Sequence, residues 1–264
     1  MGDLLDVHRR TIERLTEQYR SDPTVLVLYI IGSVARGEAH ALSDVDAGII
    51  VTDEEYARHR EAGGILIDAS DQSGEPGSEA SVSVSDLGYL RSAAERAPEP
   101  TRFAFQQAIV LFSRQPEIDR LIAAIPSYPE RERTEKMASF ACQLPVHLSY
   151  LVLADYSENP YLLVDTVHEL ALFGSRLILA HNRLLYPGRK QLLRQLDRAP
   201  EKPERFEWLL RRMLRQPSIP TATAFCDAVL GFRDWPQPAE GVTARYLRDR
   251  DMAWLHRPPS LAES

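Results

Sequence analysis

The chain has 264 residues, of which 44% are hydrophobic and 26% are charged, a balance that is typical of a folded globular protein with one or two domains. The formal net charge of −7 argues against a general nucleic-acid binder, because contacts with phosphates require clustered Lys and Arg. The sequence shows no signal peptide and no apolar run near the roughly 18 residues that span a membrane. We therefore expect a cytoplasmic protein that does not bind membranes.

An amphipathic helix is predicted over residues 3–20, where apolar side chains recur at helical spacing between charged ones. Two apolar runs follow, residues 25–31 and residues 47–51, and each is typical of a buried strand. The segment between them, Gly32 to Asp46, reads GSVARGEAHALSDVD. This segment links the two strands and concentrates the residue types that bind phosphates and metals.

Asp44 and Asp46 lie two positions apart at the start of the second strand, so their carboxylates are expected to project from the same face. Oxygen ligands presented in this way suit Mg²⁺, which is held in proteins by one or two carboxylates together with substrate phosphates. Gly32 and Ser33 end the first strand, where a glycine allows a ligand to approach the backbone and a hydroxyl donates to phosphate oxygens. Arg36 is a candidate phosphate or base contact, and a solvated arginine is an equally good interpretation.

Beyond the second strand the pattern alternates between helix and strand, and from about Glu130 it is helical throughout. The expected helices and strands of the first part are residues 53–62 (helix), 65–67 and 79–85 (strands), 86–97 (helix, ended by Pro98 and Pro100) and 106–112 (edge strand), with a further helix from Pro116. The expected helices of the second part are residues 131–157, 160–183, 189–196, 203–214 and 221–232, before a tail that Trp254 is expected to anchor. The pattern predicts an α+β protein, with a mixed β-sheet domain over residues 1–126 and a helical bundle over residues 127–264.

The motif Gly32-Ser33, ten residues, then Asp44-x-Asp46 resembles the signature of the polymerase-β-like nucleotidyltransferases, and the Ala35-Arg36-Gly37 insertion resembles the aminoglycoside adenylyltransferase branch. The resemblance implies transfer of a nucleoside monophosphate, with ATP as the donor, to a hydroxyl of a small aminoglycoside-like acceptor, with pyrophosphate released. It also implies two Mg²⁺ ions, held by the two aspartates, and a function in antibiotic resistance.

A third carboxylate is implied by the same resemblance near the start of the strand at residues 79–85, where it serves as metal ligand or general base. Ser81 occupies the expected position in this chain. Glu79 is the first candidate for the missing group, Asp68 is the second, and the absence of any such carboxylate is the third possibility. In that last case the protein is a nucleotide-binding protein without turnover, or an antitoxin-like interaction protein.

In the helical half, Glu169 is a candidate to bind acceptor amines, to act as base or to supply the third carboxylate, and a structural pair with Arg176 is an alternative. His147 and Tyr150 suit the lining of an acceptor pocket, although such residues at helical spacing more often pack in a core. Lys190 is a candidate contact for the triphosphate, with a solvated lysine as the alternative.

The expected partners are therefore a nucleoside triphosphate and a small-molecule acceptor, without nucleic acid. Two Arg-rich stretches, residues 205–215 and 245–250, are interleaved with acids or core residues and are expected to form solvated helix faces. The identity of the acceptor, the base of the nucleotide and the oligomeric state stay open at the level of the sequence.

Overall fold

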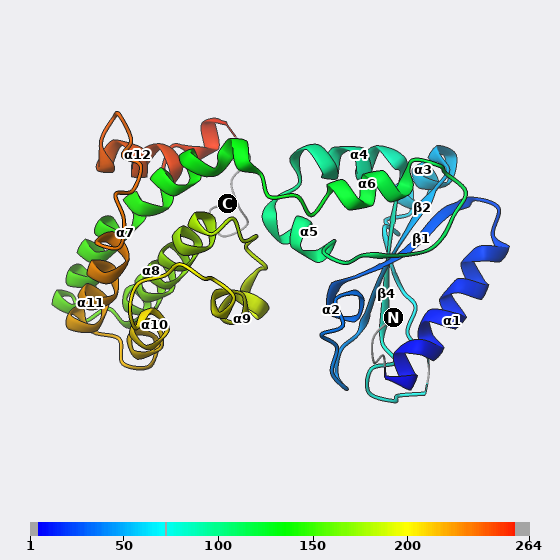
Figure 1. Cartoon of the computed structure of the whole chain (residues 1–264), viewed down its shortest axis with the longest axis horizontal. Coiled ribbons are helices and arrows are strands. Elements are labelled where there is room, and N and C mark those ends of the chain that lie inside the picture. Colours follow the sequence, from blue (N-terminus) through cyan, green and yellow to red (C-terminus); the bar gives the residue numbers. More distant parts are fainter. Residues whose placement is uncertain (1–4, 72, 257–264) are drawn as a thin grey trace. The chain divides into compact units, whose positions relative to one another are not determined.

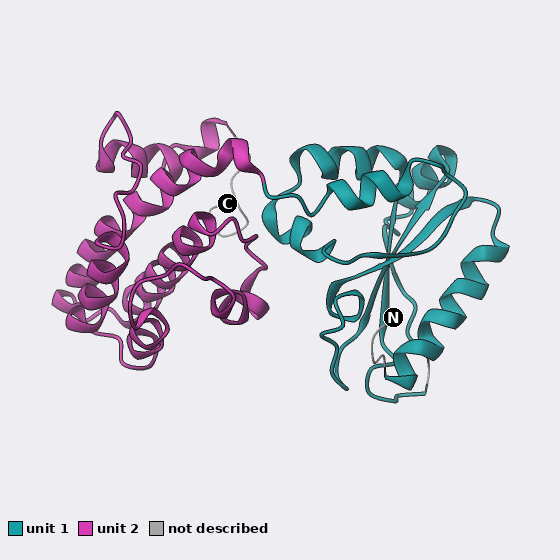
Figure 2. Ribbon diagram, in the orientation of Figure 1, with its two compact units in different colours: residues 1–128 teal, residues 129–264 magenta. Residues whose placement is uncertain are grey.

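The computed structural model describes residues 5–71 and 73–256. The chain divides into two compact units, residues 1–128 and residues 129–264 (Figure 2). The first unit combines a five-stranded sheet with helices, and the second is helical. The predicted α+β class is confirmed.

The first unit contains five strands and the helices that pack around them (Figure 1). Its strands are β1 (Val25–Ile31), β2 (Val45–Val51), β3 (Leu66–Asp68), β4 (Ala80–Ser85) and β5 (Ile109–Ser113). Its helices are α1 (Asp6–Ser21), α2 (Gly32–Ala35), α3 (Asp53–Glu61), α4 (Leu87–Arg96), α5 (Glu99–Ala104) and α6 (Ile118–Ala124).

The sheet has the strand order β3-β4-β2-β1-β5, in which only the neighbours β2 and β4 run parallel. Alternate side chains of β1 pack in two different cores, because successive side chains of a strand point to opposite faces of the sheet. Leu28 and Ile30 pack with α1 on one face, whereas Val27 and Tyr29 pack with α4 and α6 on the other. Both faces of the central strands are covered, which explains why β1 and β2 are almost continuously apolar.

Two helices of this unit begin directly after a polar side chain that caps their first turn. The hydroxyl of Thr52 accepts a hydrogen bond from the backbone N–H of Glu55 at the start of α3 (3.3 Å). The carboxylate of Asp86 accepts one from the N–H of Tyr89 at the start of α4 (2.7 Å). Both side chains satisfy a backbone donor that the helix itself leaves unpaired.

The segment around Pro98 and Pro100 was expected only to end a helix, yet it also begins one. Pro98 precedes α5, and Pro100 lies in its first turn. Proline is tolerated there because a first-turn N–H has no partner within the helix. The expected break is therefore a junction between α4 and α5.

The junction is held by Arg102, a side chain of α5 that is only 4% exposed. Its guanidinium donates to five backbone carbonyls that follow or end α4 and α6, namely those of Ala94 (3.2 Å), Glu95 (3.0 Å), Ala97 (2.8 Å), Ile125 (2.9 Å) and Ser127 (3.2 Å). The last carbonyls of a helix lack helical partners, so a single buried cation satisfies two helix ends and balances their partial negative charge.

We expect Arg102→Met to lower the free energy of unfolding by about 3 kcal/mol, because several buried carbonyls lose their donor at once. Urea denaturation measures the change. Arg91→Met is the matched control, since Arg91 also joins the α4 and α6 region but is 57% exposed and pairs with Glu117. The control should change stability by less than about 1 kcal/mol, and equal losses in the two variants would contradict the role of Arg102.

The second unit is built from helices alone within the residues that the structure describes. They are η1 (Glu130–Glu132), α7 (Arg133–Tyr156), α8 (Pro160–His181), η2 (Arg189–Gln191), α9 (Leu192–Asp197), α10 (Phe206–Arg215), α11 (Ile219–Leu230), α12 (Val242–Asp249) and η3 (Ala253–Leu255). Among the described residues, Glu130–Tyr156 is the one helical stretch long and apolar enough to span a membrane by length and composition, and 56% of its most apolar window is buried in the bundle.

Three details of this unit differ from the sequence-based prediction. The helix expected from residue 203 begins at Phe206, because Arg205 has a positive φ of 58° and lies outside the helix. The tail contains α12, whose eight residues are too few for a clear periodic signal. Trp254 is 64% exposed and does not anchor the tail, whereas Trp235 is buried and donates its indole N–H to the Val229 carbonyl (2.9 Å).

Candidate functional site

The register of the sheet brings three polar residues into one row. Asp46 of β2 lies opposite Ile31 of β1 on one side and Ser81 of β4 on the other. Ser81 in turn lies opposite Asp68 of β3. Residues in register on neighbouring strands point to the same face and are separated by about 4.8 Å. Asp46, Ser81 and Asp68 therefore form a row across β2, β4 and β3.

The backbone at Gly32 passes directly against the Asp46 carboxylate. Gly32 has a φ of +76°, and a Cβ atom added there would overlap the Asp46 Oδ2 atom and lie 3.3 Å from Cγ. Only glycine combines this backbone conformation with this close approach. The predicted phosphate-binding turn and one of the two predicted metal ligands are therefore neighbours in space.

The remaining residues of the motif lie around this contact. Ser33 follows Gly32 in the four-residue helix α2 and is partly exposed. Asp44 is exposed and precedes β2 by one residue, so the strand supports Asp46 directly and Asp44 only at its end. Asp44 is therefore open to solvent, whereas Asp46 is partly buried.

The two candidates for a third carboxylate differ in their contacts. Glu79 is exposed, and its carboxylate accepts a hydrogen bond from the backbone N–H of Gly77 (2.9 Å). The Asp68 carboxylate accepts one from the N–H of Ser70 (3.0 Å), and hydrogen bonds from Ser70 lower the pKa of Asp68. Within the described residues, no group of three or more His, Cys, Asp or Glu side chains is close enough to hold a metal ion. Ser81 thus lies where a third acid was expected, and the metal-binding role of Asp44 and Asp46 stays a prediction.

Arg36 has strong contacts within its own unit. Its side chain is 7% exposed, its Nε donates to the Glu38 carboxylate (3.0 Å), and its guanidinium carbon lies 4.5 Å from the centre of the Phe103 ring. The Nη1 atom has no hydrogen-bond partner among the residues that the structure describes. These contacts fix the C-terminal end of the Gly32 turn, and the phosphate contact of Arg36 stays a prediction.

Three candidates in the helical unit lie together in an aromatic cluster. The ring of His147 on α7 is within 6.1 Å of three other ring centres, those of Tyr150 (6.0 Å), Phe173 (6.1 Å) and Tyr246 (5.7 Å). Its Nε2 atom lies 3.7 Å from the Glu169 carboxylate. We call these residues the His147 cluster. Sequence reasoning selected His147, Tyr150 and Glu169 and missed Tyr246, because α12 was not predicted.

Glu169 has an ion-pair partner that the sequence did not suggest. Its carboxylate lies 3.2 Å from the guanidinium of Arg250, which follows α12. The guanidinium of Arg176 lies over the rings of Phe140 (4.4 Å) and Tyr186 (4.9 Å). Lys190 is exposed on η2. The pair of Glu169 with Arg250 depends on where α12 packs, so spacing along α8 did not reveal it.

Burial governs the ionisation of the His147 cluster. Loss of hydration on burial, followed by the charge of Arg250, lowers the pKa of His147 to about 4. Burial and the hydrogen bond with Tyr150 raise the pKa of Tyr246 to about 12. At neutral pH both side chains are therefore uncharged.

The depressed pKa of His147 predicts a loss of stability in acid. Between the unfolded pKa near 6.5 and the folded pKa, the unfolded chain binds a proton that the folded chain does not, so stability falls as the pH is lowered. From about pH 7.5 to about pH 5 this difference amounts to about 2 kcal/mol. Urea denaturation of His147→Phe, which keeps a ring in place, should show a pH-dependent loss smaller by that amount. The same pH dependence in both proteins would contradict the assignment.

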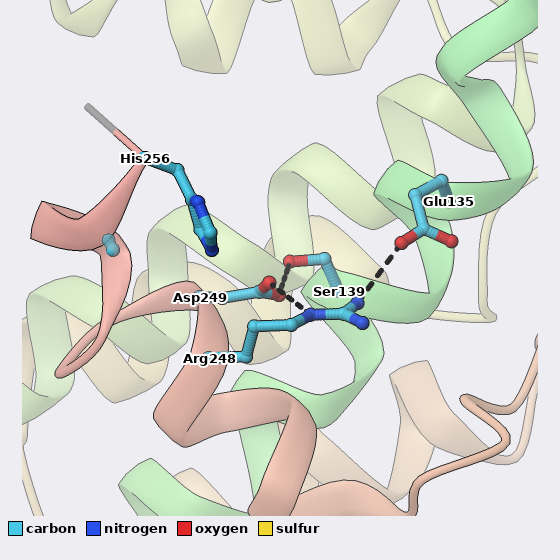
Figure 3. A pocket seen from close by; sticks show the side chains of 6 residues that line it. Glu135, Ser139, Arg248, Asp249 and His256 are labelled. Atoms are coloured by element: carbon cyan, nitrogen blue, oxygen red, sulfur yellow. Dashed lines mark hydrogen bonds and ion pairs between the residues drawn. The ribbon is translucent and has the colours of Figure 1, made fainter.

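A cavity of 490 Å³ lies elsewhere in the helical unit, lined by Glu135, Ser139, Arg248, Asp249, Ala253 and His256 (Figure 3). Ser139 of α7 donates to the Asp249 carboxylate, and Arg248 donates to Glu135 (3.2 Å). The charged groups in the lining thus pair with one another and tie α12 to α7. None of the predicted site residues lines this cavity.

Residues 4–69 match the family described as "Putative nucleotidyltransferase DUF294". The N-terminal quarter of the chain is similar to nucleotidyltransferases. The matched residues include Gly32, Asp44, Asp46 and Asp68 and end before Ser81.

A structural comparison finds the crystal structure of a nucleotidyltransferase-like protein from Exiguobacterium sibiricum 255-15. The identity is 12%, the alignment covers 96% of this chain and 82% of the other, and the TM-score is 0.46. A comparison with curated protein sequences gave no significant match.

Proposed function

We propose that the protein is a Mg²⁺-dependent nucleotidyltransferase that transfers a nucleoside monophosphate, AMP from ATP, to a hydroxyl of a small molecule. The observation that carries the proposal is the close approach of Gly32 to the Asp46 carboxylate, in a segment that matches a nucleotidyltransferase family. A glycine turn against a carboxylate places backbone N–H groups and an anionic oxygen side by side, which suits a phosphate and a cation that bridge one another.

Asp44 and Asp46 would hold the Mg²⁺ ions, and their donor set fits, because carboxylate oxygens on a strand end are hard ligands with room for water and phosphate oxygens. When bound, Mg²⁺ neutralises negative charge on the triphosphate. Gly32 and Ser33 would orient the phosphates through the backbone and the hydroxyl. The acceptor oxygen then attacks the α-phosphorus, the bond to the bridging oxygen breaks, and pyrophosphate leaves.

The acceptor hydroxyl must lose a proton in this step. Asp68 lies in the row of Asp46 and Ser81 and is ionised at neutral pH, since hydrogen bonds lower its pKa. Glu79 lies before the parallel strand β4, and its carboxylate bonds to Gly77. We keep Glu79 as the first candidate for base and third ligand, with Asp68 as the second, and an aminoglycoside-like compound as the acceptor to test.

Calorimetric titration with an α,β-methylene analogue of ATP tests the metal site. Wild-type protein should bind the analogue with Mg²⁺ and lose most of this affinity without it, because uncompensated phosphate charge faces the two aspartates. Asp46→Asn should reduce the Mg²⁺-dependent affinity at least about 10-fold, while Asp71→Asn, which changes an exposed acid of the same unit, should leave it unchanged. Binding that is equally strong in Asp46→Asn would rule out the proposed metal ligand.

The same titration separates the third-carboxylate candidates. Glu79→Gln and Asp68→Asn each keep the hydrogen bonds of the parent side chain in part and remove the charge. We expect a weaker Mg²⁺-dependent affinity in the variant of the residue that contributes a ligand, and wild-type affinity in the other. If neither variant changes binding, the aspartate pair binds the metal alone.

Gly32→Ala directly tests the close approach of Gly32 to the Asp46 carboxylate. The added methyl group meets the Asp46 carboxylate, and the positive φ adds strain of about 1 kcal/mol. We expect a lower midpoint of thermal unfolding together with loss of Mg²⁺-dependent binding. Gly37→Ala is the matched control, since Gly37 also has a positive φ (67°) but open space around its Cα. Equal binding in the two variants would contradict the role of Gly32.

A second candidate function is nucleotide binding without turnover, which Ser81 beside Asp46 favours. It predicts Mg²⁺-dependent binding of ATP and no release of pyrophosphate with any acceptor. If this second function is correct, the row of Asp46, Ser81 and Asp68 lacks one acid at position 81. Ser81→Asp supplies this acid and should therefore tighten Mg²⁺ binding. Release of pyrophosphate by the wild-type protein in a screen of hydroxyl acceptors would exclude this candidate.

A further inference from the structure

The helical unit exposes an apolar surface where α7 ends and α8 begins. Five large apolar side chains are about half exposed or more, namely Val152 (50%), Leu153 (49%), Tyr156 (88%), Tyr161 (81%) and Val164 (65%). We call these five residues the hairpin-tip patch. Single exposed apolar residues are ordinary in soluble proteins, whereas a group of this size on one short hairpin indicates an interaction surface.

The core of the helical unit does not use this surface. On α7 the buried Leu151 and Ala154 point into the bundle, and the patch residues between and after them point outward. On α8, Val167 and Leu170 are buried in the core, whereas Tyr161 and Val164 in the preceding turns are exposed. The patch therefore lies outside the packed core of its own bundle.

The charged side chains of the chain segment that carries the patch are all negative. Residues 137–175 contain no Lys or Arg but four carboxylates. Three of them, Asp155, Glu158 and Asp165, are exposed near the hairpin tip. A partner that covers the patch must therefore offer apolar surface flanked by cations. This charge disfavours an anionic membrane surface, which attracts basic segments.

Such a surface exists on α10 of the same chain. Trp208 is 44% exposed, and the guanidinium carbons of Arg205 and Arg212 lie 4.1 Å and 5.0 Å from the centre of its ring. Arg211 and Arg215 are exposed on the same side of the helix. We call these five residues the α10 face.

The α10 face is opposite the buried residues Phe206, Leu210 and Met213 and so points to solvent. None of its four arginines forms an ion pair with the residues that the structure describes. Residues 183–215 contain ten Lys and Arg and four Asp and Glu, so this segment is positive in a chain of net charge −7. Tryptophan and arginine are the residue types that most often dominate the energy of an interface.

We propose that a second copy of the chain covers the hairpin-tip patch with its α10 face, in a reciprocal two-fold dimer. Each copy offers both surfaces, and the proposed two-fold axis makes the two contacts equivalent and closes the assembly as a pair. The tyrosines and the tryptophan bury apolar surface, and the arginines meet Asp155, Glu158 and Asp165. This inference is independent of the nucleotidyltransferase site.

Sedimentation velocity of the full chain over a range of concentrations tests the dimer. Wild type should shift from monomer to dimer as its concentration rises, and higher salt should weaken the association. Trp208→Ala and Tyr156→Ser should each weaken it at least about 30-fold, as loss of a central aromatic residue does. Leu42→Ser is the control, because Leu42 is an apolar residue of the other unit with 77% exposure.

Two combinations of variants test the pairing of the surfaces. Asp165→Arg and Arg212→Glu should each weaken the dimer, and the double variant should regain part of the affinity because the charges are exchanged. A mixture of the Trp208→Ala and Tyr156→Ser chains should form a heterodimer through its one intact contact, although each chain alone is monomeric.

A wild-type chain that stays monomeric at every soluble concentration would overturn the proposal. A dimer that is lost in Tyr156→Ser but unchanged in Trp208→Ala would also overturn it, since the hairpin tips would then contact each other. At a concentration where wild type is monomeric, thermal unfolding of each variant should match that of wild type, because every substituted side chain is exposed. This measurement separates lost association from lost folding.

Discussion

The antiparallel pairing of β1 with β2 is the constraint on which the first unit depends. Its register places Asp46 opposite Ile31, so the next residue, Gly32, must turn the chain directly over the aspartate. The pairing is strongly specified because both faces of these strands are buried, and a slip by one residue would move every apolar side chain to the wrong core. The stability of the sheet and the geometry of the candidate site thus have the same origin.

Arginines that satisfy helix ends are a second feature of the fold. Arg102 binds the carbonyls that end α4 and α6, and Arg133 in the helical unit donates to the carbonyls of Ala180 (2.9 Å) and His181 (3.0 Å) at the end of α8. Each guanidinium has several donors in a fixed plane and stays charged, so one side chain replaces several missing partners. Many arginines of this chain are therefore structural, which reduces the number available to contact a nucleotide.

The helical unit separates its charges along the chain. Acidic and apolar side chains gather on the α7 and α8 hairpin, and basic ones gather from η2 to α10. Within the bundle, His147 stays neutral among aromatic rings, and Glu169 is paired with Arg250. The candidate site residues of this unit, such as His147 and Glu169, are thus largely engaged in packing. Its exposed aromatic residues lie on the surface, where they are free to meet a partner.

The sequence by itself determined the α+β class, the positions of most helices and strands and the motif from Gly32 to Asp46, because periodicity, helix caps and glycine turns are local signals. It did not reveal α12, the helix after Pro98 or the pairing of Glu169 with Arg250. Only the tertiary structure decided that Asp46, Ser81 and Asp68 form a row, since strand register joins residues that are 13 to 35 positions apart. Contacts of that kind depend on how the whole sheet assembles, and no local pattern records them.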